Sequence, residues 1–234
     1  NLIIYNFPPS WNGERIKEFL KGHVDEQTFE TCSISQSKKK TYTVKIQAQS
    51  KPESVQIIEK LTQAGHTALL AGGCVRDLLL NSIPKDFDIV TDALPDQIQA
   101  LFPNSLDIGK QFGIIIVPFA QSTSEPFQIE IATFRSDGEY TDGRHPLNVQ
   151  FSNPVEDSKR RDFTVNAMYF DPLTQSVHDY VQGQADLKRK LLKAVGVPQK
   201  RFEEDKLRML RAIRFSAQLD FEIESDTLNA IQKY

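Results

Sequence analysis

Cysteine is scarce in this sequence, and the two that occur exclude two classes of protein. Cys32 and Cys74 are the only cysteines among 234 residues. They are too few for the disulfide framework of a small secreted domain and lack the paired spacing of a zinc site. The four histidines are scattered and add no ligand pattern. We therefore expect a protein of a reducing, cytoplasmic compartment.

Long apolar runs and an excess of positive charge are missing as well. No stretch approaches the roughly 20 apolar residues that span a bilayer, so we expect no membrane partner and no signal peptide. The net charge of −3 and the pI near 5.9 do not indicate a nucleic-acid binder, because such domains tend to be basic. Local basic clusters hold phosphates regardless of net charge, and they occur at 38–40, 159–161 and 188–190.

A glycine pair follows a short apolar stretch at 67–70 and precedes a predicted helix at 75–80. This order is typical of a buried strand that turns tightly into a helix. Gly72 and Gly73 would lie at the helix N-terminus, where outward N–H groups and missing Cβ atoms let a phosphate approach. A glycine pair alone is ordinary turn chemistry, so this interpretation depends on the residues that follow.

Two aspartates follow this turn, separated by one residue. On a strand, Asp86 and Asp88 would project from one face while Phe87 and Ile89 point into the core. Two adjacent carboxylates suit Mg²⁺ that also binds substrate phosphates. A lone Asp-x-Asp is usually a solvated strand end, but together with the preceding glycine turn it favours a phosphate and metal site.

A third acid lies in a strand predicted at 127–134, which we expect to neighbour a buried strand at 112–117. On a central strand beside the aspartate pair, Glu130 would be a further metal-site acid or a base. On an edge strand it would be an ordinary surface residue. The sequence leaves these alternatives open.

Helical spacing over 158–168 would place three polar side chains, Asp162, Asn166 and Tyr169, on one side with Arg161 beside them. An arginine supplies bidentate contacts to phosphate, and Asp or Asn side chains bond ribose hydroxyls. The segment therefore predicts a nucleotide-binding element.

A longer helix is predicted over 201–215. Glu204, Arg208 and Arg211 would form one stripe, with Asp205 three residues before Arg208. Taken alone, such a ladder is most often a set of exposed ion pairs of little energetic value. The opposite side is apolar and is expected to face the core: Leu207, Leu210 and Ile213.

In this order the motifs resemble the class II tRNA nucleotidyltransferases, the family of CCA-adding enzymes and bacterial poly(A) polymerases. The resemblance covers Ser54 to Tyr234 and rests on Gly-Gly-x-Val-Arg-Asp, Lys-Asp-Phe-Asp-Ile-Val-Thr, Glu-x-x-Thr-Phe-Arg, Arg-Arg-Asp-Phe-Thr-x-Asn-Ala and Glu-Asp-x-x-Arg-x-x-Arg. It implies an α/β (α+β) fold whose nucleotidyltransferase head, a mixed sheet flanked by helices, spans 51–180. The start of a helical neck would follow at 181–234, and the chain would be the N-terminal catalytic part of a longer protein.

The resemblance also implies the chemistry, which is transfer of C and A from CTP and ATP to the 3′ end of tRNA. Asp86 and Asp88 would hold two Mg²⁺ ions, with Glu130 as a further catalytic acid. The nucleotide and its phosphates would be bound by Gly72, Gly73, Arg76, Arg161, Asp162 and Asn166. Asp205 and Arg208 would bond the Watson–Crick edge of C or A, and the residues that hold them in place would be Glu204 and Arg211.

Two segments bear on the choice within the family. Gly109–Ile114 stands where bacterial poly(A) polymerases have a basic Arg-Arg-Phe-Arg-Leu type of sequence. The segment 135–146 resembles the flexible loop of CCA-adding enzymes, with Asp142 and Arg144 at the positions that help the step from C to A. Both favour CCA addition. A poly(A) polymerase or an A-adding enzyme remains an alternative, and a non-catalytic RNA- or nucleotide-binding module is the alternative of another class. The oligomeric state stays open.

Residues 1–50 form a separate segment before a predicted linker at Lys51-Pro52. Strands at 2–7, 29–35 and 42–47 and a helix at 13–20 give a β-α-β-β order that faintly resembles half of an RNA-recognition motif. In such a motif, sheet aromatics stack on bases. The corresponding side chains here would be Tyr5 and Tyr42, although an isolated tyrosine on a strand is usually half-buried packing.

Overall fold

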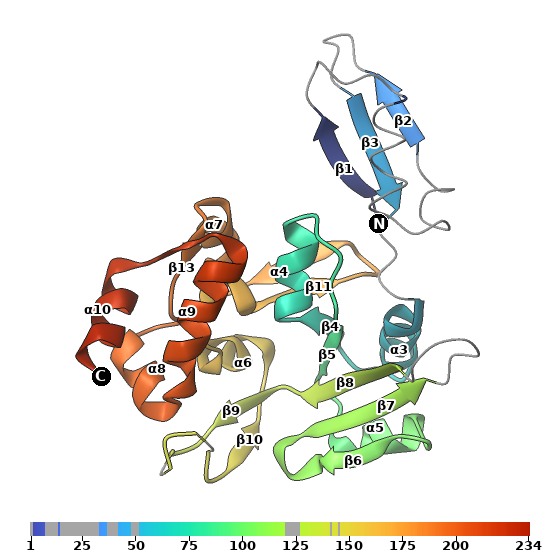
Figure 1. Cartoon of the computed structure of the whole chain (residues 1–234). Helices are drawn as coiled ribbons and strands as arrows, with labels where there is room; N and C mark the ends of the chain where they lie inside the picture. Colours follow the sequence, from blue (N-terminus) through green and yellow to red (C-terminus); the bar gives the residue numbers. More distant parts are fainter. Residues whose placement is uncertain are drawn as a thin grey trace. The chain divides into compact units, whose positions relative to one another are not determined.

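The chain divides into two units, Asn1–Pro52 and Glu53–Tyr234 (Figure 1). The computed structural model describes residues 2–7, 14, 33–36, 42–47, 52–119, 127–140, 142–144 and 146–234.

A three-stranded antiparallel sheet is described in the first unit. Its strands are β1 (Leu2–Phe7), β2 (Ser33–Gln36) and β3 (Tyr42–Gln47), in the order β1-β3-β2. The predicted strands at 2–7 and 42–47 are confirmed. Apart from Glu14, which is helical, the helix predicted at 13–20 lies outside the described residues, as do the side chains of Tyr5 and Tyr42.

A mixed seven-stranded sheet forms the centre of the second unit. Its strands are β4 (Ala68–Ala71), β5 (Asp88–Thr91), β6 (Leu106–Gly109), β7 (Ile114–Phe119), β8 (Phe127–Thr133), β11 (Met168–Asp171) and β12 (Ser176–Asp179). They lie in the order β12-β11-β4-β5-β8-β7-β6. β5 and β8 are parallel, and the other neighbouring pairs are antiparallel. The predicted mixed sheet is confirmed.

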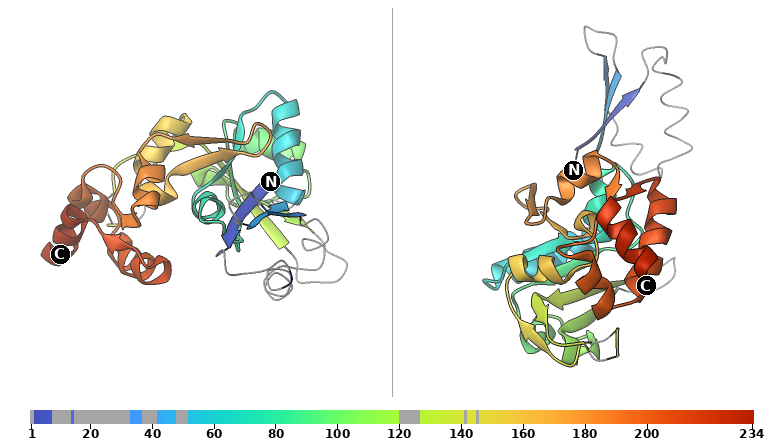
Figure 2. Two further views of the ribbon diagram at one scale, coloured as in Figure 1. Left: turned by 90° about the horizontal axis from the view of Figure 1, so that it is seen from above. Right: turned by 90° about the vertical axis from the view of Figure 1, so that its left-hand side faces the viewer.

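Helices flank this sheet and continue beyond it. They are α3 (Pro52–Gln63), α4 (Gly73–Leu79), α5 (Pro95–Leu101), α6 (Pro154–Arg160), α7 (Gly183–Lys188), α8 (Pro198–Glu204), α9 (Leu207–Leu219) and α10 (Ser225–Lys233), with 3₁₀ turns η1 (Lys110–Phe112) and η2 (Thr164–Asn166). Two short ladders pair β9 (Arg135–Asp137) with β10 (Val149–Phe151) and β13 (Leu191–Leu192) with β14 (Glu222–Ile223). Helices α8 to α10, orange to red, gather at one end of the unit (Figure 2).

Local sequence signals explain where several helices begin. Pro95, Pro154 and Pro198 are the first residues of α5, α6 and α8, where the missing N–H of proline has no intrahelical partner to lose. The Asn153 side chain accepts a hydrogen bond of 3.1 Å from the Glu156 amide and so caps α6.

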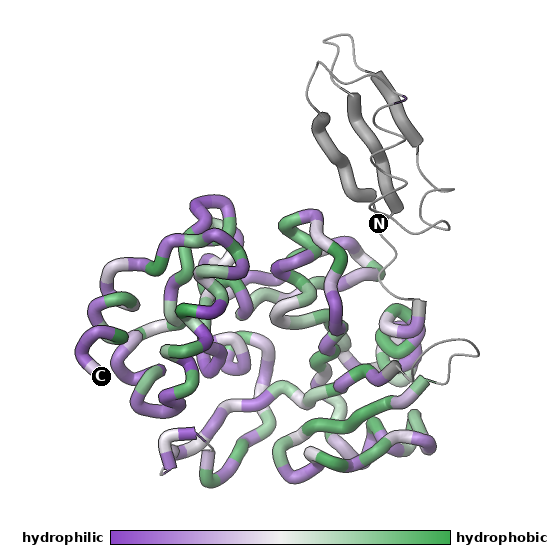
Figure 3. The backbone as a smooth tube through the Cα atoms, viewed as in Figure 1, coloured by the Kyte–Doolittle hydropathy of each residue, from purple (hydrophilic) through white to green (hydrophobic). Residues whose placement is uncertain are grey.

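The central strands are buried on both faces. Leu70 and Ile89 belong to the main core with the flanking helices, whereas Leu69 and Val90 pack on the opposite face with Tyr169. Strands covered on both sides need apolar residues at successive positions rather than in alternation. Figure 3 shows this apolar character along β7, beside the mixed colouring of the helices.

The helix predicted through 158–168 is wrong. Helix α6 ends at Arg160, and Arg161 is already extended (φ −69°, ψ 163°). The next residues pair with 193–195: the Thr164 amide donates to the Lys193 carbonyl, and the Val195 amide donates to the Asp162 carbonyl. Because this pairing buries the Phe163 ring completely, tertiary contacts override the helical spacing.

The single helix predicted over 201–215 is also wrong, because the chain breaks between α8 and α9. Asp205 leaves the helical region (φ −143°, ψ 105°). Its carboxylate instead accepts a hydrogen bond of 2.9 Å from the Leu207 amide at the start of α9. Aspartate commonly satisfies exposed helix amides in this way, so one charged residue ends α8 and opens α9.

Helix α9 faces the opposite way to the prediction. Leu207, Leu210 and Ile213 are exposed, at 42%, 65% and 53%, whereas Arg208 and Phe215 are buried. The core side of α9 therefore carries a guanidinium and an aromatic ring, and its apolar stripe faces outward.

No helix among the described residues is long and apolar enough to cross a membrane.

Two isoleucines test how strongly the sheet depends on its central strand. We expect Ile89→Ala, at a position with no exposed surface, to lower the free energy of unfolding by about 2–5 kcal/mol, since it leaves a cavity. The matched control Ile83→Ala, at 66% exposure, should change it by less than about 0.5 kcal/mol. Urea unfolding followed by circular dichroism measures both, and equal losses would contradict the burial pattern.

Candidate functional site

The glycine turn lies between β4 and α4, as the sequence predicts. Gly72 has φ 76° and ψ −133° and precedes α4, which begins at Gly73. This backbone conformation is strained for any residue with a side chain. A Cβ atom on Gly72 would also lie 3.1 Å from Nη1 of Arg161 and 3.9 Å from Oδ2 of Asp88. The turn is therefore kept open directly beside an arginine and an aspartate.

The predicted acids gather at the adjacent end of β5. The burial of Phe87 and Ile89 is confirmed, but β5 begins at Asp88, so Asp86 precedes the strand rather than lying on it. The pairing with β4 ends at Ala71 opposite Asp88, because the chain turns away at Gly72. No further β4 residue is therefore available to pair with Asp86.

Glu130 lies on a central strand, because β8 runs between β5 and β7. It is the register partner of Asp88 in the parallel β5–β8 pair, and both side chains lie on the same face. The pKa of Asp88 is raised to about 6, because its surroundings partly desolvate the carboxyl group and because the charges of Glu130 and Asp86 repel it. Three carboxylates thus concentrate negative charge in this corner, and Arg161 offsets part of it.

A chain of polar contacts joins α4, η2 and α9. Arg76 donates to the Asn166 side-chain carbonyl at 2.7 Å and pairs with Asp77 at the same distance. Asn166 contacts the Asp162 carboxylate at 3.4 Å, and that carboxylate pairs with Arg211 at 2.6 Å. Four of the residues predicted to bind nucleotide or base therefore form one network, although Arg211 holds Asp162 rather than Asp205.

The break between α8 and α9 carries the other predicted residues. Arg208 pairs with Glu204 at 2.9 Å and lies 3.9 Å from Asp205. Its guanidinium also donates to the backbone carbonyls of Arg160 and Arg201. These contacts fix a mostly buried arginine beside the Asp205 carboxylate.

These groups line one open cavity of about 530 Å³. Its walls combine glycine backbone, arginines, aspartates, one asparagine and one phenylalanine: Gly72, Gly73, Arg76, Asp86, Asp88, Arg160, Arg161, Asp162, Asn166, Asp205, Arg208, Arg211 and Phe215. Glu130, Glu204, Asp142 and Arg144 are not among the lining residues of the described chain. A cavity whose walls combine aspartates with guanidinium groups suits a polyanion that carries a cation.

The segment 142–144 contacts the break between α8 and α9. The Lys206 amide donates to the Gly143 carbonyl at 3.1 Å, and the Arg144 amide donates to the Asp142 carboxylate at 2.8 Å. The loop is thus anchored to the residue that follows Asp205, while the side chains of Asp142 and Arg144 are exposed.

Comparison with known proteins assigns the family. Residues 68–193, more than half of the chain, match the family described as the poly(A) polymerase head domain. The chain belongs to this family. The chain is 43% identical over 182 residues to the CCA-adding enzyme of Bacillus subtilis (strain 168), a match that covers 77% of this chain and 44% of that protein. The chain thus spans less than half the length of the curated relatives that it matches.

Solved structures resemble the head domain and the helices after it. The Bacillus stearothermophilus CCA-adding enzyme in complex with CTP has 38% identity and a TM-score of 0.67, covering 77% of this chain and 43% of that one. A tRNA nucleotidyltransferase with a primer tRNA and an incoming ATP analogue has 26% identity and a TM-score of 0.55, covering 76% and 49%.

Three residues of this head-domain chain were not predicted from the sequence. Arg160 and Phe215 line the cavity, and the Phe215 ring has the guanidinium carbons of Arg76 and Arg211 within 5.3 Å of its centroid. Asp157 is buried beneath Arg160 and Arg161. Its spacing of three and four residues from these arginines, about one helical turn, is the signal that would have found it.

The thiol beside the glycine turn gives a direct test of the site's packing. Burial raises the pKa of the Cys74 thiol to about 12. Only the thiolate form of a cysteine reacts with a disulfide reagent. In a Cys32→Ser background we expect Cys74 to react with a disulfide reagent at pH 8 at least 100-fold more slowly in the folded protein than in urea. Comparable rates in both states would contradict a closed strand–turn–helix packing.

Proposed function

We propose that this chain carries the catalytic centre of a CCA-adding enzyme, which adds C and A to the 3′ end of tRNA from CTP and ATP. One observation carries the proposal: a single cavity is lined by the glycine turn, the aspartate pair, the Arg161–Asn166 segment and the α8–α9 break. The CCA-adding relatives and the solved complexes with CTP and with primer tRNA support the substrate class.

The arginines and the glycine turn would bind the triphosphate. Gly72 and Gly73 allow close approach of an anion to the first amides of α4, and Arg76 and Arg161 bring delocalised positive charge to the same wall. Asp162 and Asn166 line the same cavity, and their oxygen and amide groups would bond a ribose hydroxyl. Since these side chains already hold one another in place, binding requires little reorganisation of the site.

The acidic corner fits magnesium. Hard carboxylate oxygens are the ligands that Mg²⁺ prefers. Partial burial, and then repulsion from Glu130 and Asp86, raise the pKa of Asp88, and a bound cation would offset both. Among the described residues no three His, Cys, Asp or Glu side chains are arranged to hold one metal ion, so Asp86 and Asp88 would share the ion with phosphates and water. When bound, two Mg²⁺ ions would lower the pKa of the RNA 3′-hydroxyl and neutralise charge on the triphosphate and the leaving pyrophosphate.

Asp205 and Arg208 would select the base. A carboxylate accepts a hydrogen bond from the exocyclic amino group of C or A, and a guanidinium donates to ring acceptors, whereas U and G present the wrong groups. Glu204 and two backbone carbonyls hold Arg208 beside Asp205. The anchored 142–144 segment adjoins this pair through Lys206, and we expect it to act in the change from C to A addition.

A tRNA that lacks its 3′ CCA tests the activity. With Mg²⁺, CTP and ATP we expect addition of C, C and A and then a stop, and Asp88→Asn should lower the rate at least 100-fold because it removes a metal ligand. Tailing of any RNA with ATP alone would indicate a poly(A) polymerase, and addition of A only to a CC end would indicate an A-adding enzyme. Nucleotide binding without any transfer would leave a non-catalytic binding module.

Base selection can be tested separately from transfer. Asp205→Asn replaces an acceptor-only group with one that also donates, so we expect the preference for CTP over UTP to fall at least tenfold, in line with about 1–3 kcal/mol per bidentate base contact. The control Asp226→Asn makes the same chemical change at an exposed position of α10. Single-nucleotide incorporation gives both ratios, and an unchanged ratio in Asp205→Asn would remove that residue from base selection.

A further inference from the structure

One fully buried carboxylate holds two arginines of the cavity wall. Asp157, on α6, has no exposed side-chain surface. Its Oδ1 accepts from Nε and Nη2 of Arg160 at 2.9 and 2.8 Å, and its Oδ2 accepts from Nε of Arg161 at 3.0 Å and lies 3.0 Å from its Nη2. Each oxygen therefore faces the Nε–Nη2 edge of one guanidinium.

Additional donors complete the shell around this carboxylate. The Tyr169 hydroxyl donates to Oδ2 at 2.8 Å, and the Arg135 amide donates to Oδ1 at 3.3 Å. The Arg161 guanidinium also lies over the Tyr169 ring, 5.1 Å from its centroid. Asp157 thus makes close to the full set of hydrogen bonds that an ionised carboxylate accepts.

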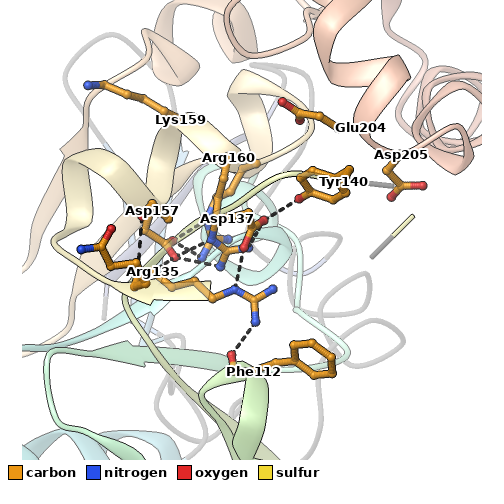
Figure 4. Close-up of polar contacts among 12 residues, drawn as sticks. Phe112, Arg135, Asp137, Tyr140, Asp157, Lys159, Arg160, Glu204 and Asp205 are labelled. Carbon is orange, nitrogen blue, oxygen red and sulfur yellow. Dashed lines mark hydrogen bonds and ion pairs between the residues drawn. The ribbon is translucent and has the colours of Figure 1, made fainter. Parts of the chain in front are cut away.

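A second carboxylate supports the arrangement from the other side (Figure 4). Asp137 on β9 lies 3.0 Å from Nε of Arg135 and 3.7 Å from Nη1 of Arg160, and it accepts a hydrogen bond of 2.6 Å from the Tyr140 hydroxyl. The Arg135 guanidinium in turn donates to the Phe112 carbonyl in η1. Arg160 is therefore fixed between two carboxylates on different elements.

The two arginines remain available to a ligand in spite of this. Their side chains are 20% and 17% exposed, and both line the cavity. A guanidinium has five N–H donors, so an edge bound to Asp157 leaves further donors of the same group. Nη1 of Arg161 lies 3.4 Å from the Asn166 carbonyl and next to the Gly72 turn.

The charges around Asp157 favour the ionised form of its carboxyl group. Burial alone would raise the pKa of Asp157, but the charges of Arg161 and Arg160 and the bond from Tyr169 lower it overall. Burial likewise opposes the charge on Arg161, yet the neighbouring Asp157 raises its pKa. The Asp157 carboxylate and the Arg161 guanidinium are therefore both charged at neutral pH.

We propose that Asp157 is a positioning residue that sets Arg160 and Arg161 in the orientation that receives the triphosphate of the incoming nucleotide. This inference rests on the proposed function of the cavity. A buried ion pair is weak evidence for stability on its own, since well-packed apolar residues often replace one at no cost. Asp157 instead fixes two cavity arginines at once, so that their orientation is set before the nucleotide arrives.

Asp186 provides a matched control. It is also buried, accepts from the Thr164 hydroxyl at 2.7 Å and pairs with Arg189 at 2.5 Å, but it does not line the nucleotide cavity. Asp157→Asn and Asp186→Asn each remove one buried charge that an arginine faces. A purely structural role of Asp157 would make the two variants alike.

The test measures the binding of ATP, ADP and AMP to the chain by isothermal titration calorimetry, with thermal unfolding beside it. We expect Asp157→Asn to weaken ATP at least tenfold and AMP less than twofold, because the loss concerns the β- and γ-phosphates. Asp186→Asn should leave all three affinities within twofold. If Asp157→Asn does not fold, Tyr169→Phe, which removes one donor from Oδ2, should weaken ATP several-fold and AMP not at all.

The possible results distinguish a failure of this inference from a failure of the proposed function. Absence of ATP binding in the unaltered chain would overturn the proposed function. Normal ATP affinity in folded Asp157→Asn, or in Tyr169→Phe where the first variant is unfolded, would overturn the positioning role while leaving the function intact. Equal weakening of ATP and AMP, or the same loss in Asp186→Asn, would mean that Asp157 is structural only.

Discussion

Charge compensation between guanidinium groups and carboxylates is the constraint on which the cavity depends. Five arginines line it, and each pairs with an acid from its own neighbourhood: Asp77, Asp157, Glu204 or Asp162. Unpaired, these cations would repel one another and carry a heavy desolvation cost. Paired, they are held in place before any ligand arrives, so the geometry that a polyanion meets is already set by folding.

The carboxylates around Asp88, by contrast, are only partly compensated by positive charge. Asp88 stands opposite Glu130 because β5 and β8 pair in parallel in that register, and Asp86 precedes Asp88 by two residues. The charge of Arg161 offsets part of the repulsion at Asp88. The arginines thus have acidic partners within the fold, while the carboxylates around Asp88 are only partly compensated. In the function proposed above, this difference would separate the subsite for phosphates from the subsite for a cation.

Much of this architecture was predictable from local pattern, because the apolar stretches and the glycine turn specify β4, β5 and α4 without contacts from distant parts of the sequence. The helices predicted over 158–168 and 201–215 failed for a different reason. Phe163 is buried by pairing with residues 193–195, and Asp205 bonds the backbone of the next helix, neither of which helical spacing reveals. The exposed apolar stripe of α9 has a similar cause, because the ion pair with Glu204 holds Arg208 on the buried side of the helix. For Asp157 the reverse holds. Its spacing from Arg160 and Arg161 is visible in the sequence and matches the ion pairs that it forms.

The order of the strands also shapes how the chain folds. Strand β4 lies between β5 and β11, and Leu70 meets Phe170 across the second of these pairings. Synthesis proceeds at about 5–20 residues per second. The edge of β4 that pairs with β11 therefore stays unpaired for roughly 5–20 seconds, until Phe170 has been synthesised. An apolar strand with one unpaired edge is a template for association with other chains. Nascent chains of this protein therefore pass through a period in which a chaperone that covers exposed strand edges would protect β4 and the glycine turn after it.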